Sequence, residues 1–168
     1  DGKMLVSGSA DKTVVVWDLA SLGAIGRLKE LHGDTVTCVA ISPDGKTLAS
    51  GSADKTIMLW GLPNLTPLSI PLQGHRDGVN QVAFSPDGKL IATGGAYGTV
   101  RLWRWQAAGG PVTLAGHTDW VNTITFSPSG GLMVTSSDDG NARLFSTPGG
   151  RLMAVMHGGS PQGLNSAA

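Results

Sequence analysis

Apolar and polar residues alternate over short runs along the chain, and tight turns separate these runs. Val79–Phe84 carries apolar residues at a strand-like spacing, and the turn 86–88 follows it. Leu90–Gly94 and Thr99–Trp103 continue the pattern as two further strands, and Val112–Leu114 is a looser fourth. Because no stretch shows a sustained helical period of apolar residues, the pattern predicts an all-β fold with essentially no helix.

The same segment returns four times, and several landmarks mark each return. The aromatic residues that close the third strand are 43, 43 and 42 positions apart, namely Trp17, Trp60, Trp103 and Phe145. The histidines recur at nearly the same period, namely His32, His75, His117 and His157. The turn 42–46 recurs at 85–89 and, in altered form, at 127–131. These spacings predict four copies of one structural unit.

These residues resemble the WD-repeat family of β-propellers, whose marks are a Gly-His pair and a Trp-Asp pair that closes the third strand. The matches are Gly74-His75, Gly116-His117 and Trp17-Asp18, and the resemblance covers nearly the whole chain. Other repeats depart from these marks: Leu31 and Met156 replace the glycine, Gly61, Arg104 and Ser146 replace the Asp, and Phe145 replaces a Trp.

The resemblance implies a β-propeller of four-stranded antiparallel blades, with four blades in this chain. We expect the blades at approximately 1–31, 32–74, 75–116 and 117–157, with 158–168 as a closing strand.

The resemblance also implies a buried hydrogen-bonded chain in each repeat, formed by a His, a Ser or Thr, an Asp and the Trp. The corresponding sets are His32, Ser50, Asp54 and Trp60; His75, Thr93 and Trp103, with Tyr97 in place of the Asp; and His117, Thr135 and Asp139, with Phe145 in place of the Trp. Ser7, Asp11 and Trp17 form a set that no His precedes, and His157 has no partners after it. A buried carboxylate is tolerated only where donors reach its oxygens, and such a network favours one blade geometry.

His, Ser and Asp together also suggest nucleophilic catalysis. A catalytic site needs one such set, whereas these sets repeat, and this favours a structural role. Histidines about 42 residues apart lie in separate blades and not around one zinc ion. No Gly-rich loop between a strand and a helix supports nucleotide binding. We therefore expect no catalytic residue, no metal and no cofactor.

Charge and cysteine content narrow the choice of partner and compartment. Lys plus Arg and Asp plus Glu number 12 each, which argues against a broad surface for nucleic acid or an acidic membrane. No apolar run approaches the roughly 20 residues of a membrane-spanning helix. The single cysteine, Cys38, excludes an intramolecular disulfide and fits a reducing compartment, so we expect a cytoplasmic protein.

Trp120 is the strongest candidate for a binding residue. The other repeats have Thr35 and Gly78 at this position, so the fold does not require an aromatic side chain there. The resemblance places the position on the top face, where partners of the family dock, and rigid aromatic residues are favoured binding anchors. The surrounding loops would present Thr118, Asp119, Arg76, Asp77, Tyr97 and Asp138. Local packing is the alternative for Trp120, and sequence drift is the alternative for Tyr97.

The two ends of the sequence complement each other. The first repeat lacks its first strand, and Leu164–Ala168 resembles Val79–Ala83, although the register of this tail is open. Three arrangements are consistent with this: two chains exchange tail strands and close an eight-bladed ring, the chain is part of a longer propeller, or one chain closes alone with four blades. We favour the two-chain ring, a homo-oligomer.

The leading functional hypothesis is a non-catalytic scaffold that binds a protein or peptide through its loops. An enzyme would need converging acids or metal ligands that are specific to one blade, and the sequence has none. A third hypothesis is a repeat segment or assembly unit of a larger propeller with no evolved ligand of its own. The similarity of Gly8–Thr13 to Gly51–Thr56 suggests recent duplication and favours this third hypothesis.

Overall fold

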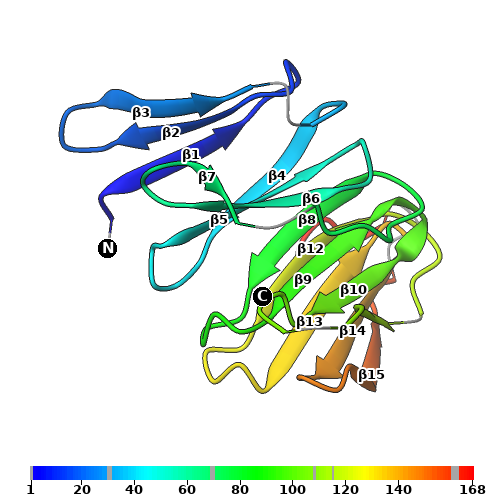
Figure 1. The fold of residues 1–168 in the computed structure, drawn as a ribbon. Helices are drawn as coiled ribbons and strands as arrows, with labels where there is room; N and C mark the ends of the chain where they lie inside the picture. The colour runs from blue at the N-terminus through cyan, green and yellow to red at the C-terminus, as the bar shows by residue number, and fades with distance from the viewer. Residues whose placement is uncertain (1, 30–31, 69–70, 108, 115, 160–162) are drawn as a thin grey trace. The chain divides into compact units, whose positions relative to one another are not determined.

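The computed structural model of the chain describes residues 2–29, 32–68, 71–107, 109–114, 116–159 and 163–168. The chain divides into two compact units, Asp1–Val79 and Asn80–Ala168, and each is described by itself. Both consist of antiparallel sheets (Figure 1), and the one helical segment among the described residues is the short 3-10 turn η1, Ala96–Gly98. The predicted all-β fold is therefore confirmed.

The first unit contains two sheets. The first sheet has three strands in the order β1-β2-β3, which span Met4–Gly8, Val14–Asp18 and Gly23–Leu28. The second sheet has four strands in the order β4-β5-β6-β7, which span Val36–Ile41, Thr47–Ser52, Ile57–Gly61 and Thr66–Pro67. By the blade pattern β1 corresponds to β5, so the first sheet has no counterpart of β4.

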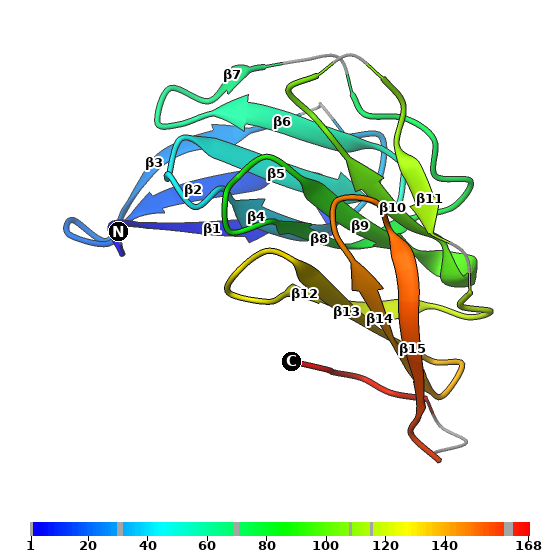
Figure 2. The same ribbon diagram turned by 90° about the horizontal axis from the view of Figure 1, so that it is seen from below.

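The second unit carries the third and fourth sheets, each of four strands (Figure 2). The third sheet has the order β8-β9-β10-β11, with strands at Val79–Phe84, Ile91–Gly95, Val100–Trp103 and Val112–Leu114. The fourth has the order β12-β13-β14-β15, with strands at Val121–Phe126, Leu132–Ser137, Asn141–Ser146 and Arg151–His157. Two of the four strands expected in the third sheet start one residue later than predicted.

The turn after the first strand accounts for one of these shifts. Leu90 was expected to open a strand, but its N–H donates to Ser85 Oγ at 2.9 Å and its carbonyl accepts from Ser85 N–H at 3.0 Å. Ser85 Oγ in turn donates to Asp87 Oδ1 at 2.6 Å, and Gly88 has a φ of 72°. The Ser-Pro-Asp-Gly sequence thus closes a turn that includes Leu90, because each polar side chain finds a local backbone partner.

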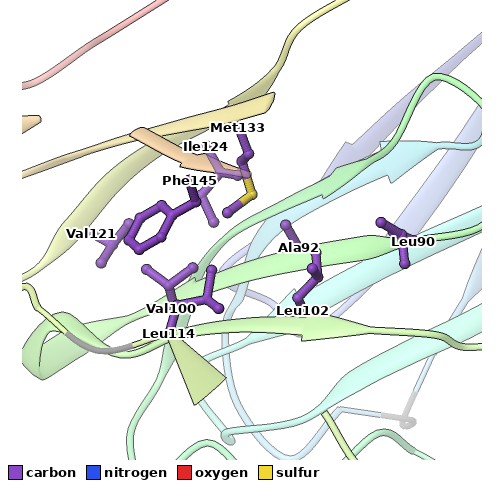
Figure 3. Close-up of a cluster of buried hydrophobic side chains, with 9 residues drawn as sticks. All are labelled: Leu90, Ala92, Val100, Leu102, Leu114, Val121, Ile124, Met133 and Phe145. Carbon is purple, nitrogen blue, oxygen red and sulfur yellow. The ribbon is translucent and has the colours of Figure 1, made fainter. Parts of the chain in front are cut away.

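Each unit has its own apolar core. In the first unit Val16, Leu48 and Trp60 are among the side chains that pack together between the two sheets. In the second unit Leu90, Val121 and Phe145 belong to a cluster of nine buried residues that joins the third and fourth sheets (Figure 3). Burial of these side chains stabilises each pair of sheets, since every buried large apolar side chain contributes about 1.5–3 kcal/mol.

Glycine lets neighbouring sheets approach closely near their first strands. A Cβ on Gly8 would lie 2.6 Å from Val36 Cγ1, and a Cβ on Gly94 would lie 2.7 Å from Val121 Cγ1. Gly8 ends β1 and Gly94 lies near the end of β9, the corresponding strand of the third sheet, and each valine opens the first strand of the next sheet. The small residue that the sequence has at this position therefore serves close packing between sheets.

Candidate functional site

In the second sheet, four side chains form a continuous hydrogen-bonded chain. Trp60 Nε1 donates to Ser50 Oγ at 3.2 Å, and Ser50 Oγ lies 2.8 Å from His32 Nε2. His32 Nδ1 lies 3.0 Å from Asp54 Oδ2, which also accepts from Gly33 N–H at 2.7 Å. Because an ionised carboxylate only accepts, the contact with Asp54 needs a proton on His32 Nδ1.

This chain has the connectivity of a Ser-His-Asp triad but not its accessibility. Ser50 has no exposed surface, and 2% of the His32 side chain is exposed. Burial raises the pKa of Asp54, but hydrogen bonds from Thr56, Gly33 and His32 outweigh it and hold that pKa below its ordinary value. A hydroxyl that no substrate can reach fits a structural role, in which the polar groups satisfy one another inside the sheet.

The fourth sheet repeats the arrangement with a change. His117 Nε2 lies 2.7 Å from Thr135 Oγ1, and His117 Nδ1 lies 2.9 Å from Asp139 Oδ2. Phe145 has no N–H to extend this chain. Instead Arg143 enters it, donating to Asp139 Oδ2 at 2.8 Å and contacting His117 Nδ1. Arg143 was not predicted from the sequence: the matching positions of the earlier repeats hold Val15, Met58 and Arg101, so the first two repeats differ from it but the third also has an arginine.

Arg143 changes the electrostatics of this network. Burial lowers the pKa of His117, Asp139 opposes that shift, and the Arg143 charge adds to it. Burial of the Asp139 carboxyl disfavours its ionised form, but hydrogen bonds from His117 and Arg143 prevail and hold its pKa well below the ordinary value. At neutral pH the network therefore contains a neutral imidazole, a carboxylate and a guanidinium.

The remaining network residues lie as follows. Trp17 Nε1 donates to Ser7 Oγ at 3.1 Å, and Asp11 Oδ1 accepts from the Thr13 hydroxyl at 2.7 Å. Trp103 Nε1 donates to Thr93 Oγ1 at 2.8 Å, and His75 is buried. His157 differs from the other three histidines: it is exposed at the end of β15, where Nδ1 lies 2.6 Å from Asn141 Oδ1. It differs because it is still part of a strand, whereas His32, His75 and His117 lie in loops between strands.

At one end of the second unit, Tyr97 and Trp120 lie on adjoining loops with 70% and 50% of their surface exposed. Tyr97 is in η1 with a left-handed φ of 59°. The next residue, Gly98, has a φ of 72°, and a Cβ there would lie 2.1 Å from the His117 carbonyl oxygen. The η1 turn therefore packs directly on the backbone that leads to Trp120.

Hydrogen bonds hold the loop of Trp120 in place. Thr118 N–H donates to the buried Asp139 Oδ2 at 3.1 Å, and Trp120 N–H donates to Asp119 Oδ1 at 2.8 Å. The Trp120 carbonyl accepts from Asp138 N–H at 3.0 Å. We call the exposed Tyr97, Thr118, Asp119, Trp120 and Asp138 the Trp120 surface. The structure brings these five of the seven predicted binding residues together in the second unit.

The other two predicted binding residues, Arg76 and Asp77, belong to the first unit. Arg76 is exposed and Asp77 is half-buried. Because each unit is described by itself, their relation to the Trp120 surface stays a prediction.

The residues 163–168 run along the fourth sheet beside β12 (Figure 2). Leu164 N–H donates to the Ser137 carbonyl at 2.9 Å, as Val36 N–H at the start of β4 donates to the Ser9 carbonyl at 3.1 Å. Ser9 and Ser137 occupy the same position of their repeats. Leu164 is therefore placed like the first residue of a following inner strand, and this observation fixes the register that the sequence left open.

No group of three or more His, Cys, Asp or Glu side chains within the described ranges is arranged to hold a metal ion. Among the same residues, no helix is long and apolar enough to cross a membrane. Cys38, the one cysteine, is free and buried, and burial raises the pKa of its thiol to about 12.

Comparison with known protein families shows which family has this repeated arrangement of strands. The sequence profile of the WD40 family, described as "WD domain, G-beta repeat", matches residues 1–18, 26–61, 66–104 and 111–146. The chain belongs to the WD40 family. Its four sheets are thus four WD40 blades, the first of which has three strands here. The blade boundaries at 31, 74, 116 and 157 stay predictions, and residues 31 and 160–162 lie outside the described residues.

One curated relative is "Nuclear distribution protein PAC1" of Yarrowia lipolytica. It is 49% identical to this chain over 43 residues, which are 26% of this chain. The match covers 10% of the length of that protein, so the similarity is that of about one WD40 repeat.

Proposed function

We propose that this WD40 chain is a non-catalytic protein-interaction scaffold whose partner binds at the Trp120 surface. The observation that carries the proposal is the exposure of two aromatic side chains, Tyr97 and Trp120, on loops that pack against each other. Rigid aromatic side chains lose little conformational entropy on binding and dominate many protein interfaces. The Ser50 and Thr135 hydroxyls are buried and out of reach of a substrate, which supports a non-catalytic role.

The charge of the surface supports a choice of partner. Asp119 and Asp138 flank the exposed indole, and neither carboxylate has an ion pair within the described part of the chain. We therefore expect a peptide or loop that places an apolar side chain against Trp120 and a basic side chain near these carboxylates. Arg76 and Asp77 are included in the proposed site because of the family resemblance.

We also propose a reducing compartment such as the cytoplasm, which the free Cys38 supports.

The test compares variants in the recovery of partners from an extract of the native host. Trp120→Ala and Tyr97→Ala are expected to lose a specific bound protein with little change in thermal midpoint, because both side chains are exposed. Leu22→Ala is the matched control, since Leu22 is 79% exposed and lies in the other unit. If Trp120→Ala keeps all partners that Leu22→Ala keeps, the Trp120 surface is not the site. A collapse of the midpoint would assign Trp120 to packing.

We also propose that two copies of the chain associate and complete an eight-bladed ring. The register of Leu164 supports this, because residues 164–168 lie where an inner strand would lie, and β1 pairs with β2 alone among the described strands. Exposed apolar side chains on β15 and on the first sheet add to the argument; they are Leu152, Met153, Val155, Met156, Leu5 and Ile25. If the first sheet of a second copy paired with residues 164–168, the exposed apolar side chains of that sheet and those of β15 would be covered.

Light scattering after size-exclusion chromatography tests the association. We expect twice the mass of a single chain, and we expect that deletion of residues 158–168 reduces it to that of a single chain. If the deletion leaves the assembly unchanged, strand exchange through the tail is wrong. A single-chain mass for the parent would instead favour the alternative of a repeat segment or assembly unit of a larger propeller with no ligand of its own.

A further inference from the structure

A cavity of about 520 Å³ opens between the third and fourth blades of the second unit. It lies at the end of β9 where Leu90 precedes the strand, whereas Tyr97 follows the opposite end of β9. Its wall includes the turns between the first and second strands of both blades and the segments that follow β10 and β14. Cavities of roughly 300–1,000 Å³ are typical of sites for small ligands and peptide side chains.

Two departures from the repeat lie on the wall of this cavity. Ser129 and Gly131 stand where the preceding turn has Asp87 and Lys89. A Cβ on Gly131 would meet Ser129 Oγ at 3.7 Å, which is ordinary contact, and Gly131 is not among the glycines with a positive φ. Neither packing nor backbone conformation therefore requires glycine at this position. The missing side chain leaves open space that a lysine would occupy.

A third departure supplies charge. Arg104 stands where the first repeat has Asp18, it is exposed, and it forms no ion pair or side-chain hydrogen bond with the described residues. The next residue, Trp105, fixes this segment: its Nε1 donates to the Gly88 carbonyl at 3.0 Å, and its ring meets Phe84 edge-on at 6.2 Å. Trp105 thus fixes the backbone of the segment that brings Arg104 to the cavity wall, and the guanidinium has no partner among those residues.

The balance of charge around the cavity is positive. Lys89 Nζ is 4.0 Å from Asp87 Oδ2, and 77% of the Lys89 side chain is exposed, so this pair is weak. Asp87 Oδ1 already accepts from Ser85 Oγ and Lys89 N–H. Two cations and one carboxylate therefore line the cavity, and the turn of the fourth blade has the Ser129 hydroxyl where each earlier turn has an aspartate. This arrangement complements an anionic group.

The wall also has an apolar part. Leu90 is 7% exposed and belongs to the core cluster between the blades (Figure 3), and Pro148 lines the cavity from the fourth blade. We propose that this cavity binds a peptide segment in which an acidic side chain is next to an apolar one. The acidic side chain pairs with Arg104 and Lys89, and the apolar one packs on Leu90 and Pro148. The site is separate from the Trp120 surface and does not depend on it.

The test measures fluorescence anisotropy of a dye-labelled, capped hexapeptide of alternating leucine and glutamate, added to the full chain. We expect saturable binding that weakens at high salt, and much weaker binding of the same peptide with glutamine in place of glutamate. Arg104→Gln is expected to weaken binding about threefold to fivefold, the effect of one partly screened ion pair. Gly131→Met places an uncharged side chain in the cavity and is expected to abolish binding.

Two controls distinguish binding in this cavity from binding elsewhere on the chain. Lys46→Gln removes one positive charge from the matching turn of the second blade and is expected to leave the affinity within about twofold, because Lys46 does not line the cavity and exposed charges are screened by salt. Trp120→Ala is expected to bind the peptide like the parent, so failure of the Trp120 surface would not affect this result. Equal binding of the glutamine peptide, or unchanged binding by Arg104→Gln and Gly131→Met, would overturn the proposal. Competition by inorganic phosphate as strong as by unlabelled peptide would also overturn it, because the cavity would then be a simple anion site.

Discussion

A guanidinium nitrogen of Arg143 lies 2.8 Å from Asp139 Oδ2, and 4% of the Asp139 side chain is exposed. This ion pair lies inside the fourth blade, at the position where the second blade has Met58. The network of the fourth blade thus lacks an indole N–H donor at the Thr135 hydroxyl and has instead a buried cation at Asp139 and His117, the other end of the network. The network of the fourth blade is therefore electrostatic to a degree that the network of the second blade is not.

Asp139→Asn should be strongly destabilising. It leaves the Arg143 guanidinium without a carboxylate, and loss of one partner of a buried pair costs about 3 kcal/mol. The measurement is the free energy of unfolding from urea denaturation. Asp54→Asn is the matched control, because Asp54 bonds His32 but no arginine. Its expected cost is about 1–2 kcal/mol. A cost of Asp54→Asn equal to or above that of Asp139→Asn would show that Arg143 adds nothing.

Acid should destabilise the second unit partly through Asp139. Because its pKa is lower in the folded chain than in the unfolded chain, the ionised carboxylate contributes its full stability above about pH 4, and this contribution is lost as pH falls further. The urea midpoint of the parent should therefore fall between about pH 5 and pH 2.5, and the midpoint of Asp139→Asn should fall less steeply. Parallel profiles for the two proteins would contradict the assignment.

Arg143→Met, which introduces the residue of the second blade, should raise the pKa of His117. The Arg143 charge opposes protonation of the neighbouring imidazole, and its removal leaves Asp139 to favour the protonated form. An NMR titration of the His117 ring proton measures this pKa. Arg151→Met removes an exposed arginine from β15 and should leave it unchanged. A pKa that stays constant or falls in Arg143→Met would refute the electrostatic role of Arg143.

Gly98→Ala should unfold or strongly destabilise the third blade. Alanine at a φ of 72° costs about 1 kcal/mol, and its Cβ would also lie 2.1 Å from the His117 carbonyl oxygen. We expect a total cost of at least about 3 kcal/mol in urea denaturation. Gly130→Ala isolates the backbone effect, since Gly130 has the same φ and its Cβ would be 3.5 Å from Pro86. Equal losses of unfolding free energy in the two variants would mean that η1 can move away from the His117 carbonyl at no energetic cost.

Local sequence was sufficient to predict the four strands of the third sheet, two of which start one residue later than expected. Ser85 and Asp87 close their turn with their own neighbours, so a short window of sequence contains all the necessary information. The set of His32, Ser50 and Asp54 could be assigned because a known family repeats it. Their hydrogen bonds then follow from the strand pairing that places them together.

The parts that sequence could not predict depend on contacts between repeats or on missing side chains. Arg143 is an ordinary polar residue in an alternating strand until the position of His117 is known. The cavity beside Arg104 depends on the absence of a side chain at Gly131, and a cavity cannot be predicted from the pattern of residue types alone. The register of Leu164 needed a hydrogen bond to Ser137, which lies 27 residues earlier in the chain.

The hydrogen bond from Thr118 N–H to Asp139 Oδ2 connects the loop of an exposed indole to a carboxylate that solvent scarcely reaches. The conformation of the loop that carries Trp120 is thus set in part from inside the blade. A mutational screen for lost binding would select Asp139, Arg143 and His117 together with Trp120, although a partner bound at that surface would touch only the last of them. A binding interface mapped from such a screen would wrongly include these three residues unless each variant is also tested for folding.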